Sequence, residues 1–412
     1  MDDMGNSNVR KNITKLSFGD AKLDEKFFQS LVCWRQLNEP ASRIMLTSQD
    51  EYDTLNKLNV FCDFFYPHQE RIWSQVDCIV ESNDPASLFV LCVIAFNSLD
   101  VSKIQRVVEA IIEYNESPDS LISALIFSPK HIIDPWLERF IKSKELTHKY
   151  VALSVFSVRK ENPEPYLSKI FEREDCRRHE KLFGRALKII GEIKLSDCRD
   201  LLYSDMRTDS SELAFWSMWS KVILGDSDLI YEMEGFVVHP GPMQEFAIDL
   251  VFRLASDEYN LKLMASMLNV PGNTRSVMYA SMVWGNVQCI PFLIQNMEIP
   301  LYARYAGRVF SFVTGIDLVK KGLTLDVPVI TELTFNQSNS KTSYVRAIDE
   351  NFPWPNVEKI KAVWQTYGNQ FPKDKRLIYG KEISPTVICE YIEAAPAWER
   401  DMLVMERTIN YS

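Results

Sequence analysis

The stretch LFGRALKIIGEIKLSDCRDLL, residues 182–202, is one unit of the pattern that decides the fold. Apolar residues recur with a helical period from Leu182 to Ile190, and a second helical segment runs from Asp197 to Leu202. Ala186 stands inside the first segment, where a small side chain lets a neighbouring helix approach closely. We therefore interpret the stretch as two antiparallel helices joined by a polar turn.

The same unit recurs on both sides of this stretch. Small residues fall inside apolar helical segments at gaps of 34, 28, 33, 33 and 26 residues, namely Ala152, Ala186, Ala214, Ala247, Ala280 and Ala306. A period of about thirty residues corresponds to one helical hairpin per repeat, and hairpins must stack because none can bury its apolar face alone. The predicted fold class is all-α, a HEAT-like α-solenoid of antiparallel helix pairs with an irregular C-terminal cap.

Periodicity and composition divide the chain into four regions. These are a polar N-terminal tail at 1–25, an N-terminal helical region at 26–148, HEAT-like helical repeats at 149–317, and a C-terminal cap region at 318–412. The last region loses the helical period, with a loop predicted at 336–340. Because the final apolar face of a solenoid must be covered, we expect this region to be a cap. The alternative is that it forms a docking platform for a partner.

Helix ends are marked by residues that cap them. Asp, Asn or Ser, in two cases followed by Pro, predicts helix starts at Asp84-Pro85, Asn356 and Ser384-Pro385. Gly315 predicts a left-handed C-cap. Acidic residues in the turns are expected to cap the second helix of three repeats: Asp197, Asp226-Ser227-Asp228 and Asp257.

Composition narrows the classes of partner. The 412 residues carry a net charge of −10, and an acidic surface repels nucleic acid. The longest basic cluster, Arg177-Arg178-His179 with Lys181, follows several acidic residues and is interpreted as a mixed, solvated helix face. No apolar stretch approaches the roughly 18 residues of a membrane-spanning helix, and the N-terminus lacks the apolar core of a signal peptide. We expect a cytoplasmic protein with no direct membrane insertion.

The sequence offers no catalytic or cofactor motif. It lacks GxGxxG, GxxxxGK[ST], HExxH and GxSxG. Cys176 and His179 are three residues apart on an expected surface helix, but two ligands do not make a metal site. Residues 239–242 (HPGP) are interpreted as a turn. The predictions are therefore no catalytic residues, no metal ligands and no cofactor.

Three tryptophans are candidate partner-binding residues: Trp216, Trp219 and Trp354. Trp and Tyr dominate binding hot spots, so an exposed Trp216–Trp219 pair would serve as an anchor. The alternative is that this pair belongs to the core, because large aromatic side chains carry much of core burial. Pro353 and Pro355 are expected to fix an extended segment that lays Trp354 against the last repeat.

Two C-terminal stretches carry a resemblance. The first is AGRVFSFVTGIDL at 306–318, and the second combines FPWP at 352–355 with Lys359, Trp364, Phe371-Pro372, Arg376 and Tyr379-Gly380-Lys381. Their order and spacing resemble an uncharacterised bacterial family of HEAT-repeat proteins, encoded in type VI secretion gene clusters beside spike, PAAR-like and effector genes. The resemblance implies an accessory role in type VI secretion and implies no catalytic residues.

These observations lead to one expected function and two alternatives. The expectation is a non-catalytic protein-binding scaffold, an adaptor or chaperone that holds a type VI secretion effector or a spike or PAAR-like component. An acidic solenoid would suit a basic cargo. The first alternative is an immunity protein that occludes a cognate toxin. The second, from another class, is an enzyme with an unrecognised site.

Overall fold

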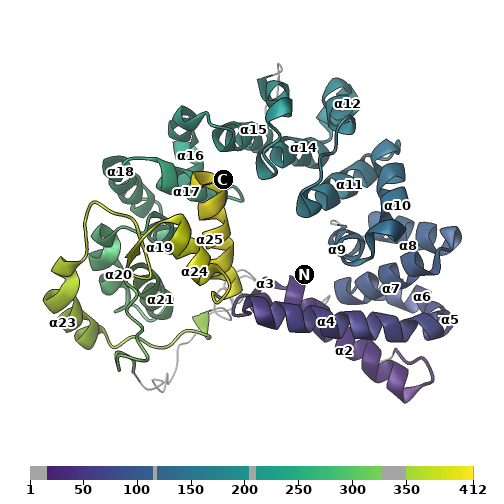
Figure 1. The fold of residues 1–412 in the computed structure, drawn as a ribbon, viewed down its shortest axis with the longest axis horizontal. Helices are drawn as coiled ribbons and strands as arrows, with labels where there is room; N and C mark the ends of the chain where they lie inside the picture. The colour runs from purple at the N-terminus through teal and green to yellow at the C-terminus, as the bar shows by residue number, and fades with distance from the viewer. Residues whose placement is uncertain (1–15, 115–117, 204–209, 326–348, 412) are drawn as a thin grey trace. The chain divides into compact units, whose positions relative to one another are not determined.

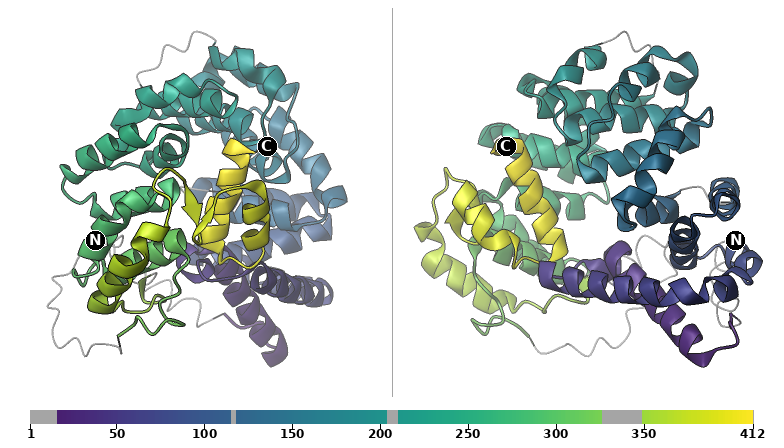
Figure 2. Two further views of the ribbon diagram at one scale, coloured as in Figure 1. Left: turned by 60° about the vertical axis from the view of Figure 1, so that its left-hand side comes forward. Right: turned by 45° about the vertical axis from the view of Figure 1, so that its right-hand side comes forward.

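The computed structural model describes residues 16–114, 118–203, 210–325 and 349–411, which form two helical units. The N-terminal unit comprises the described residues up to Ser42 and Asp50–Gly225, and the C-terminal unit comprises Arg43–Gln49 and the described residues from Asp226. Their boundary falls inside the region 149–317 that the sequence suggests is one array. Helices dominate both units in every view, which confirms the all-α class (Figures 1 and 2).

The N-terminal unit is built from consecutive helices. Their bounds are α2 (Ala21–Asn38), α3 (Pro40–Arg43), α4 (Ser48–Phe65), α5 (Gln69–Trp73), α6 (Val76–Ser82), α7 (Pro85–Ser98), α8 (Val101–Tyr114), α9 (Asp119–Phe127), α10 (Lys130–Lys142), α11 (Leu146–Arg159), α12 (Tyr166–Glu172), α13 (Glu174–Arg178), α14 (Glu180–Glu192) and α15 (Ser211–Ile223). Short 3₁₀ helices, η1 (Tyr66–His68) and η2 (Ser196–Tyr203), interrupt them. The predicted polar tail 1–25 is described only from Leu16, and α2 already begins at Ala21.

The core of this unit is formed by helices that are close together in the sequence. Contacts join α7 to α9, α9 to α11, α11 to α14 and α14 to α15, so alternate helices form one continuous buried layer. Helix α7 is apolar on all sides, and every residue from Ala86 to Phe96 is buried. Its start confirms the predicted cap, because the Asp84 carboxylate accepts a hydrogen bond from the Ser87 N–H at 2.9 Å and Pro85 is the first helical residue.

The return segments of the repeats differ from the prediction. Asp197 and Asp228 lie in the first turns of 3₁₀ helices, η2 and η3 (Ser227–Met233), rather than capping α-helices. Length does not separate these segments from the α-helices, because η3 and the α-helical α12 both have seven residues. At the third position the capping residue is Ser256, whose hydroxyl accepts from the Tyr259 N–H at 3.3 Å, one residue before the predicted Asp257.

The C-terminal unit continues in the same style and ends in an irregular segment. Its helices are α16 (Glu234–Val238), α17 (Gln244–Leu254), α18 (Asp257–Leu268), α19 (Thr274–Trp284), α20 (Ile290–Asn296), α21 (Ala303–Thr314), α23 (Val357–Tyr367), α24 (Pro385–Ile392) and α25 (Ala397–Asn410). Shorter elements are the 3₁₀ helices η3, η4 (Val287–Cys289) and η5 (Gly368–Gln370) and the antiparallel strands β1 (Leu377–Ile378) and β2 (Lys381–Glu382). The predicted caps Asn356 and Ser384 are confirmed, whereas the predicted loop 336–340 lies outside the described residues.

The strand β1 and the residue after it donate hydrogen bonds to the C-terminal ends of two helices. The Leu377 N–H donates to the Gly285 carbonyl at 2.7 Å, and the Tyr379 N–H donates to the Phe312 carbonyl at 2.6 Å. These bonds satisfy carbonyls at the C-termini of α19 and α21, which have no partner inside their helices. Gly315, with φ of +71°, ends α21 as predicted, and a Cβ there would lie 2.3 Å from the Tyr379 carbonyl oxygen.

A buried ionic network fixes α25 to the rest of the C-terminal unit. The Arg253 guanidinium, 0% exposed, donates to the Glu406 carboxylate at 2.9 Å, and Arg376 donates to the same carboxylate at 2.7 Å. About two helical turns earlier, on the same face of α25, Glu399 accepts hydrogen bonds from Arg308 and from the Tyr379 hydroxyl. Each buried carboxylate therefore joins α25 to an earlier helix and to the segment around β1.

The residues Arg43–Gln49 join the C-terminal unit through α25. The Trp398 N–H donates to the Ile44 carbonyl at 3.5 Å, and Arg400 donates to the Ser48 hydroxyl at 3.2 Å. Arg43 also pairs with Asp401 at 2.8 Å. A segment from near the start of the chain is thereby built into the unit formed mainly by its second half.

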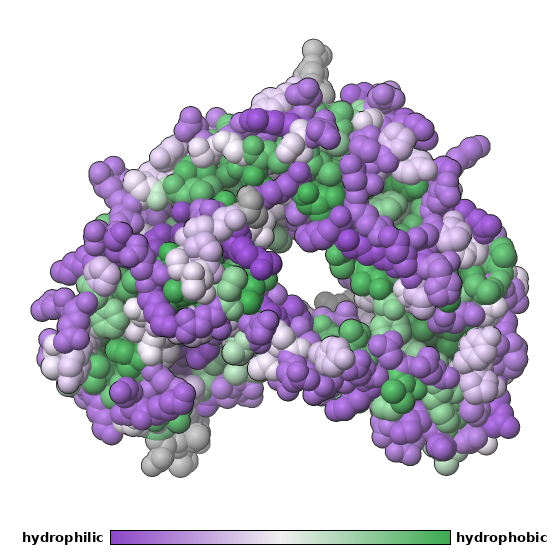
Figure 3. Space-filling view, in the orientation of Figure 1, coloured by the Kyte–Doolittle hydropathy of each residue, from purple (hydrophilic) through white to green (hydrophobic). Residues whose placement is uncertain are grey.

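The exposed surface is mainly polar. Figure 3 shows hydrophilic residues over most of the face that it draws, with hydrophobic residues between them. Within the described ranges, none of the helices has the length and the apolar character needed to cross a membrane.

Candidate functional site

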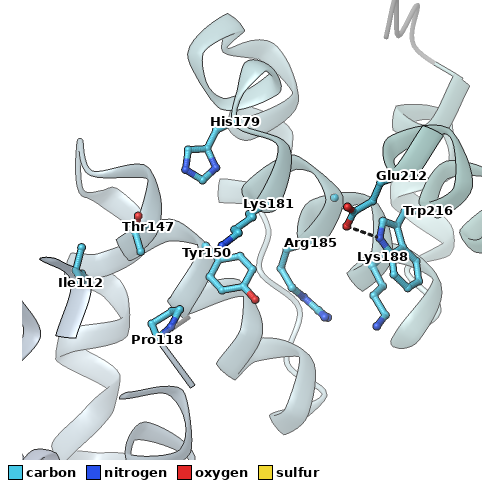
Figure 4. Close-up of a pocket in the computed structure, with 11 residues that line it drawn as sticks. Ile112, Pro118, Thr147, Tyr150, His179, Lys181, Arg185, Lys188, Glu212 and Trp216 are labelled. Atoms are coloured by element: carbon cyan, nitrogen blue, oxygen red, sulfur yellow. Dashed lines mark hydrogen bonds between the residues drawn. The ribbon is translucent and has the colours of Figure 1, made fainter. Parts of the chain in front are cut away.

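A cationic and aromatic pocket lies in the N-terminal unit between α11, α14 and α15 (Figure 4). We call it the α14 pocket, and its volume is about 410 Å³. Its walls are Ile112, Pro118, Thr147, Tyr150, His179, Lys181, Gly184, Arg185, Lys188, Glu212 and Trp216. Volumes of this size are typical of ligand-binding clefts.

The helix α14 supplies the cations because its sequence is amphipathic. Lys181, Arg185 and Lys188 are spaced by four and three residues, which places them on one face of the helix. The apolar residues of α14 occupy the opposite face and are buried: Leu182, Phe183, Ala186, Leu187, Ile189 and Ile190. Packing of the apolar face against α11 and α15 therefore turns the cationic face toward the pocket.

Arg185 is held in place by Glu192 at the end of the same helix. Its terminal nitrogens pair with the Glu192 carboxylate, which also accepts a hydrogen bond from the Ser157 hydroxyl of α11. Burial tends to raise the pKa of Glu192, but Arg185, Lys188 and Ser157 together hold it below the ordinary value. The Arg185 Nε–H is buried and has no hydrogen-bond partner in the described part of the chain.

Lys188 and Trp216 form the other end of the pocket. The Lys188 ammonium lies 4.3 Å from the centre of the Trp216 ring, a cation–π contact. Burial lowers the pKa of Lys188, Glu192 opposes that lowering, and Arg185 adds to it. The Trp216 indole N–H donates to the Glu212 carboxylate at 3.3 Å, which fixes the ring against the pocket (Figure 4).

His179 and Cys176 have structural roles in the arrangement. The His179 Nδ1 accepts a hydrogen bond from the Leu182 N–H at 3.2 Å and so caps the N-terminus of α14. Cys176 lies on a surface helix, as expected, but its own side chain is fully buried, and burial raises the pKa of its thiol. The charged residues around it are exposed instead: Arg178 pairs with Glu174 and Arg173 pairs with Asp175.

The three predicted partner-binding tryptophans occupy different environments. Trp216 is 5% exposed and lines the α14 pocket, whereas Trp219 is 3% exposed and packs against Gly191. Trp354 belongs to the C-terminal unit, where the Arg304 guanidinium of α21 lies 4.6 Å from its ring centre. The structure thus brings Trp216 and Trp219 together, with ring centres 5.8 Å apart, and places Trp354 elsewhere. Binding by any of them remains a prediction.

The sequence alone does not single out the cations of the pocket. Lys181 stands there beside the basic cluster at 177–179, and the whole cluster is typical of a solvated face. The spacing of Lys181, Arg185 and Lys188 distinguishes these three cations from the neighbouring basic cluster. It places them on one face of an otherwise apolar helix. The aromatic wall contributed by Trp216 comes from the next helix and cannot be paired with that stripe from spacing alone.

Two other hollows lie in the same unit. A groove of about 770 Å³ between α6 and α8 is mainly acidic, with Asp77, Glu81, Glu109 and Glu113 in its walls and Arg106 paired with Asp77. A pocket of about 380 Å³ has mixed walls that include Asn59, Gln69 and Asn97 together with Ile94 and Phe127. Neither combines aromatic walls with a row of cations.

Among the described residues, no three His, Cys, Asp or Glu side chains gather as ligands for a metal ion. Comparison with known proteins gives no match to a protein family, to a curated protein or to a solved structure.

Proposed function

We propose that this chain is a non-catalytic protein-binding scaffold with the architecture of a HEAT-like α-solenoid. The observation that carries the proposal is the α14 pocket, whose walls come mainly from α11, α14 and α15, helices that pack on one another in chain order. Stacked helix pairs present such continuous surfaces to protein partners. The pocket supplies the two features that dominate protein interfaces, a large aromatic ring and arginine.

The particular role proposed is an adaptor or chaperone in the bacterial cytoplasm that holds a type VI secretion effector or a spike or PAAR-like component. This role rests on the resemblance of the two C-terminal stretches. In the structure, their residues Arg376 and Tyr379 bind backbone carbonyls at the ends of α19 and α21. These two residues of the C-terminal stretches therefore stabilise the fold. We assign the proposed binding function to the N-terminal unit, which contains the α14 pocket.

The test is affinity purification of the tagged full chain from the cytoplasm in which it is native, followed by mass spectrometry. The expected result is recovery of a spike, PAAR-like or effector protein that is absent from a parallel purification with an unrelated tagged protein. Recovery of no such component by a folded, abundant chain would contradict the secretion role.

A second experiment separates the adaptor role from an immunity role. The captured effector is expressed with and without this chain, and both cell growth and secretion of the effector are measured. An adaptor changes secretion and leaves toxicity in place. An immunity protein restores growth, and that result would replace the adaptor proposal.

A further inference from the structure

We propose that a second pocket of the N-terminal unit binds an extended peptide segment of the protein partner, in which an apolar side chain stands next to Lys or Arg. We call it the α4 pocket, and it lies between α4, the start of α5, α7 and the end of α9. Its walls include Asn59, Asp63, Gln69, Ile94, Asn97 and Phe127. This inference rests on the proposed scaffold function and adds a docking site that is separate from the α14 pocket.

Part of the α4 pocket is apolar and is held by the core of the unit. Val93 and Ile94 of α7 are 2% and 5% exposed, so packing fixes both of them. The Phe127 ring of α9 contacts the Phe89 ring of α7, with ring centres 5.4 Å apart. Transfer of an apolar side chain from water onto such a surface is favourable, so these walls suit the apolar residue of a bound peptide.

Three side-chain amides stand around these apolar walls: Asn59, Gln69 and Asn97. The Asn97 Nδ2 donates to the Val93 carbonyl at 2.9 Å, which orients this amide and leaves its oxygen as an acceptor. The side chains of Asn59 and Gln69 make no hydrogen bond within the described ranges. Because a peptide that buries a side chain must still satisfy its own N–H and C=O groups, amides at this place match a peptide main chain.

The charge of the α4 pocket favours a cation. Asp63 is the charged residue of its walls, and its carboxylate makes no hydrogen bond or ion pair with the residues that the structure describes. Burial raises the pKa of the neighbouring Cys62 thiol to about 12, so that thiol stays neutral. A Lys or Arg beside the buried apolar residue would therefore meet an available carboxylate, and the net charge of −10 favours the approach of such a partner.

An exposed face of α4 extends the pocket into a surface long enough for a peptide. Tyr52, Leu55, Asn59, Cys62 and Tyr66 follow one another at spacings of three or four residues, which places them on one face of α4 and η1. Tyr52 is 60% exposed, Leu55 is 41% exposed and Tyr66 is 62% exposed. From Tyr52 to Tyr66 the rise is about 20 Å, a length that about six residues of an extended peptide cover. A small molecule would fill the pocket and leave this face exposed, so an extended peptide is the better match.

The probe is a phage-displayed library of random octapeptides, selected on the immobilised full chain. Enrichment is expected for sequences in which an apolar residue adjoins Lys or Arg. The most enriched octapeptide is then synthesised with a fluorescein label, and its affinity for the full chain is measured by fluorescence anisotropy. A copy with N-methyl groups on the main-chain nitrogens that flank the apolar residue should bind about fivefold more weakly, because it cannot donate to the side-chain amides.

The decisive variants change exposed residues inside and outside the pocket. Asp63→Lys is expected to weaken binding of the octapeptide by about tenfold or more, since an attraction becomes a repulsion. Glu172→Lys, at an exposed position of α12, makes the same change in net charge and should leave the affinity within about twofold. Asn59→Trp adds a bulky ring at the pocket wall and should abolish binding. Circular dichroism melting of the three variants checks that they remain folded.

Three results would overturn the inference: no enriched octapeptide, enrichment of sequences without the apolar and basic pair, or an affinity that Asp63→Lys lowers no more than Glu172→Lys does. An unchanged affinity of Asn59→Trp would likewise place the peptide elsewhere on the chain. None of these results bears on whether the full chain captures a secretion component. Conversely, a failed capture with an intact, Asp63-dependent peptide affinity would leave the pocket chemistry standing and remove the secretion role.

Discussion

Gly191 leaves no room for a side chain between α14 and α15. A Cβ at this position would lie 2.9 Å from the Ser220 Cα and 2.8 Å from the Trp219 ring. Gly191→Ala should therefore push the two helices apart and lower the free energy of unfolding by about 1–3 kcal/mol, the usual cost of overpacking. Urea denaturation followed by circular dichroism measures the change.

Gly184 on the same helix is the matched control. A Cβ there would make ordinary contacts of 3.4 Å or more with Trp216 and Leu213. Because Ala is the better helix former, Gly184→Ala should leave the unfolding midpoint unchanged or raise it. Equal destabilisation by both substitutions would contradict the prediction that the close approach of α15 at Gly191 causes the loss of stability.

Glu406 neutralises an arginine that has no contact with solvent. Removal of the carboxylate by Glu406→Ala would leave Arg253, 0% exposed, with Asp249 as its remaining carboxylate partner among the described residues. Breaking a buried ion pair in this way should cost about 3 kcal/mol or more, measured by urea denaturation. Glu258→Ala removes the solvent-exposed pair with Lys262 in the same unit and should change the unfolding midpoint little.

The same carboxylate makes stability depend on pH in a defined direction. Burial tends to raise the pKa of Glu406, but Arg376 and Arg253 outweigh it and hold the pKa below its ordinary value of 4.5. A lowered pKa in the folded state stabilises the protein above pH 4.5, and this stabilisation is lost as pH falls through the folded-state value. The difference in unfolding free energy between the wild type and Glu406→Gln should therefore shrink on acidification. A constant difference from pH 7 to pH 3 would contradict this.

At the scale of single elements, the start of α7 combines a helix cap with an ion pair. The Asp84 carboxylate accepts from Ser87 at the helix start and pairs with Arg35 of α2 at 2.6 Å. Asp84→Ala should lower the free energy of unfolding by about 2 kcal/mol, the upper end for loss of a cap, because the ion pair is lost as well. Asp100→Ala removes an exposed cap from α8 and should produce a smaller fall in the unfolding midpoint.

Several helix ends could be predicted because the local sequence carries a clear capping signal. Asp84, Asn356 and Ser384 begin helices where expected, and Gly315 ends one. Local hydrogen bonding decides such positions, and local sequence is sufficient to find them.

The return segments and the candidate site depend on contacts that the sequence does not display. The segment from Ser196 to Tyr203 is 3₁₀ over eight residues, whereas the shorter α12 is α-helical, so neither its length nor its apolar pattern predicts its geometry. The α14 pocket needs Trp216 from α15 beside Lys188 from α14, and that pairing arises only when the two helices pack. The buried partners Arg253 and Glu406 are 153 residues apart, a separation at which periodicity carries no information.

At the scale of the whole molecule, each unit has a buried core of its own and should unfold as a cooperative body. Calorimetry of the full chain is expected to resolve two transitions. Gly191→Ala should lower the temperature of one and Glu406→Ala the temperature of the other, because the two residues lie in different units. A single transition displaced by both substitutions would show that the chain unfolds as one body.

The network that joins α25 to α17 also sets an order of events during biosynthesis. Arg253 leaves the ribosome 153 residues before Glu406 does. At translation rates of about 5–20 residues per second, Arg253 is synthesised about 8–30 seconds before the Glu406 carboxylate that pairs with it. The N-terminal unit can fold in this interval, whereas the helix that brings the carboxylate to Arg253 is made only 153 residues later. Nascent chains paused between these two points would therefore expose the apolar surface around Arg253 to chaperones.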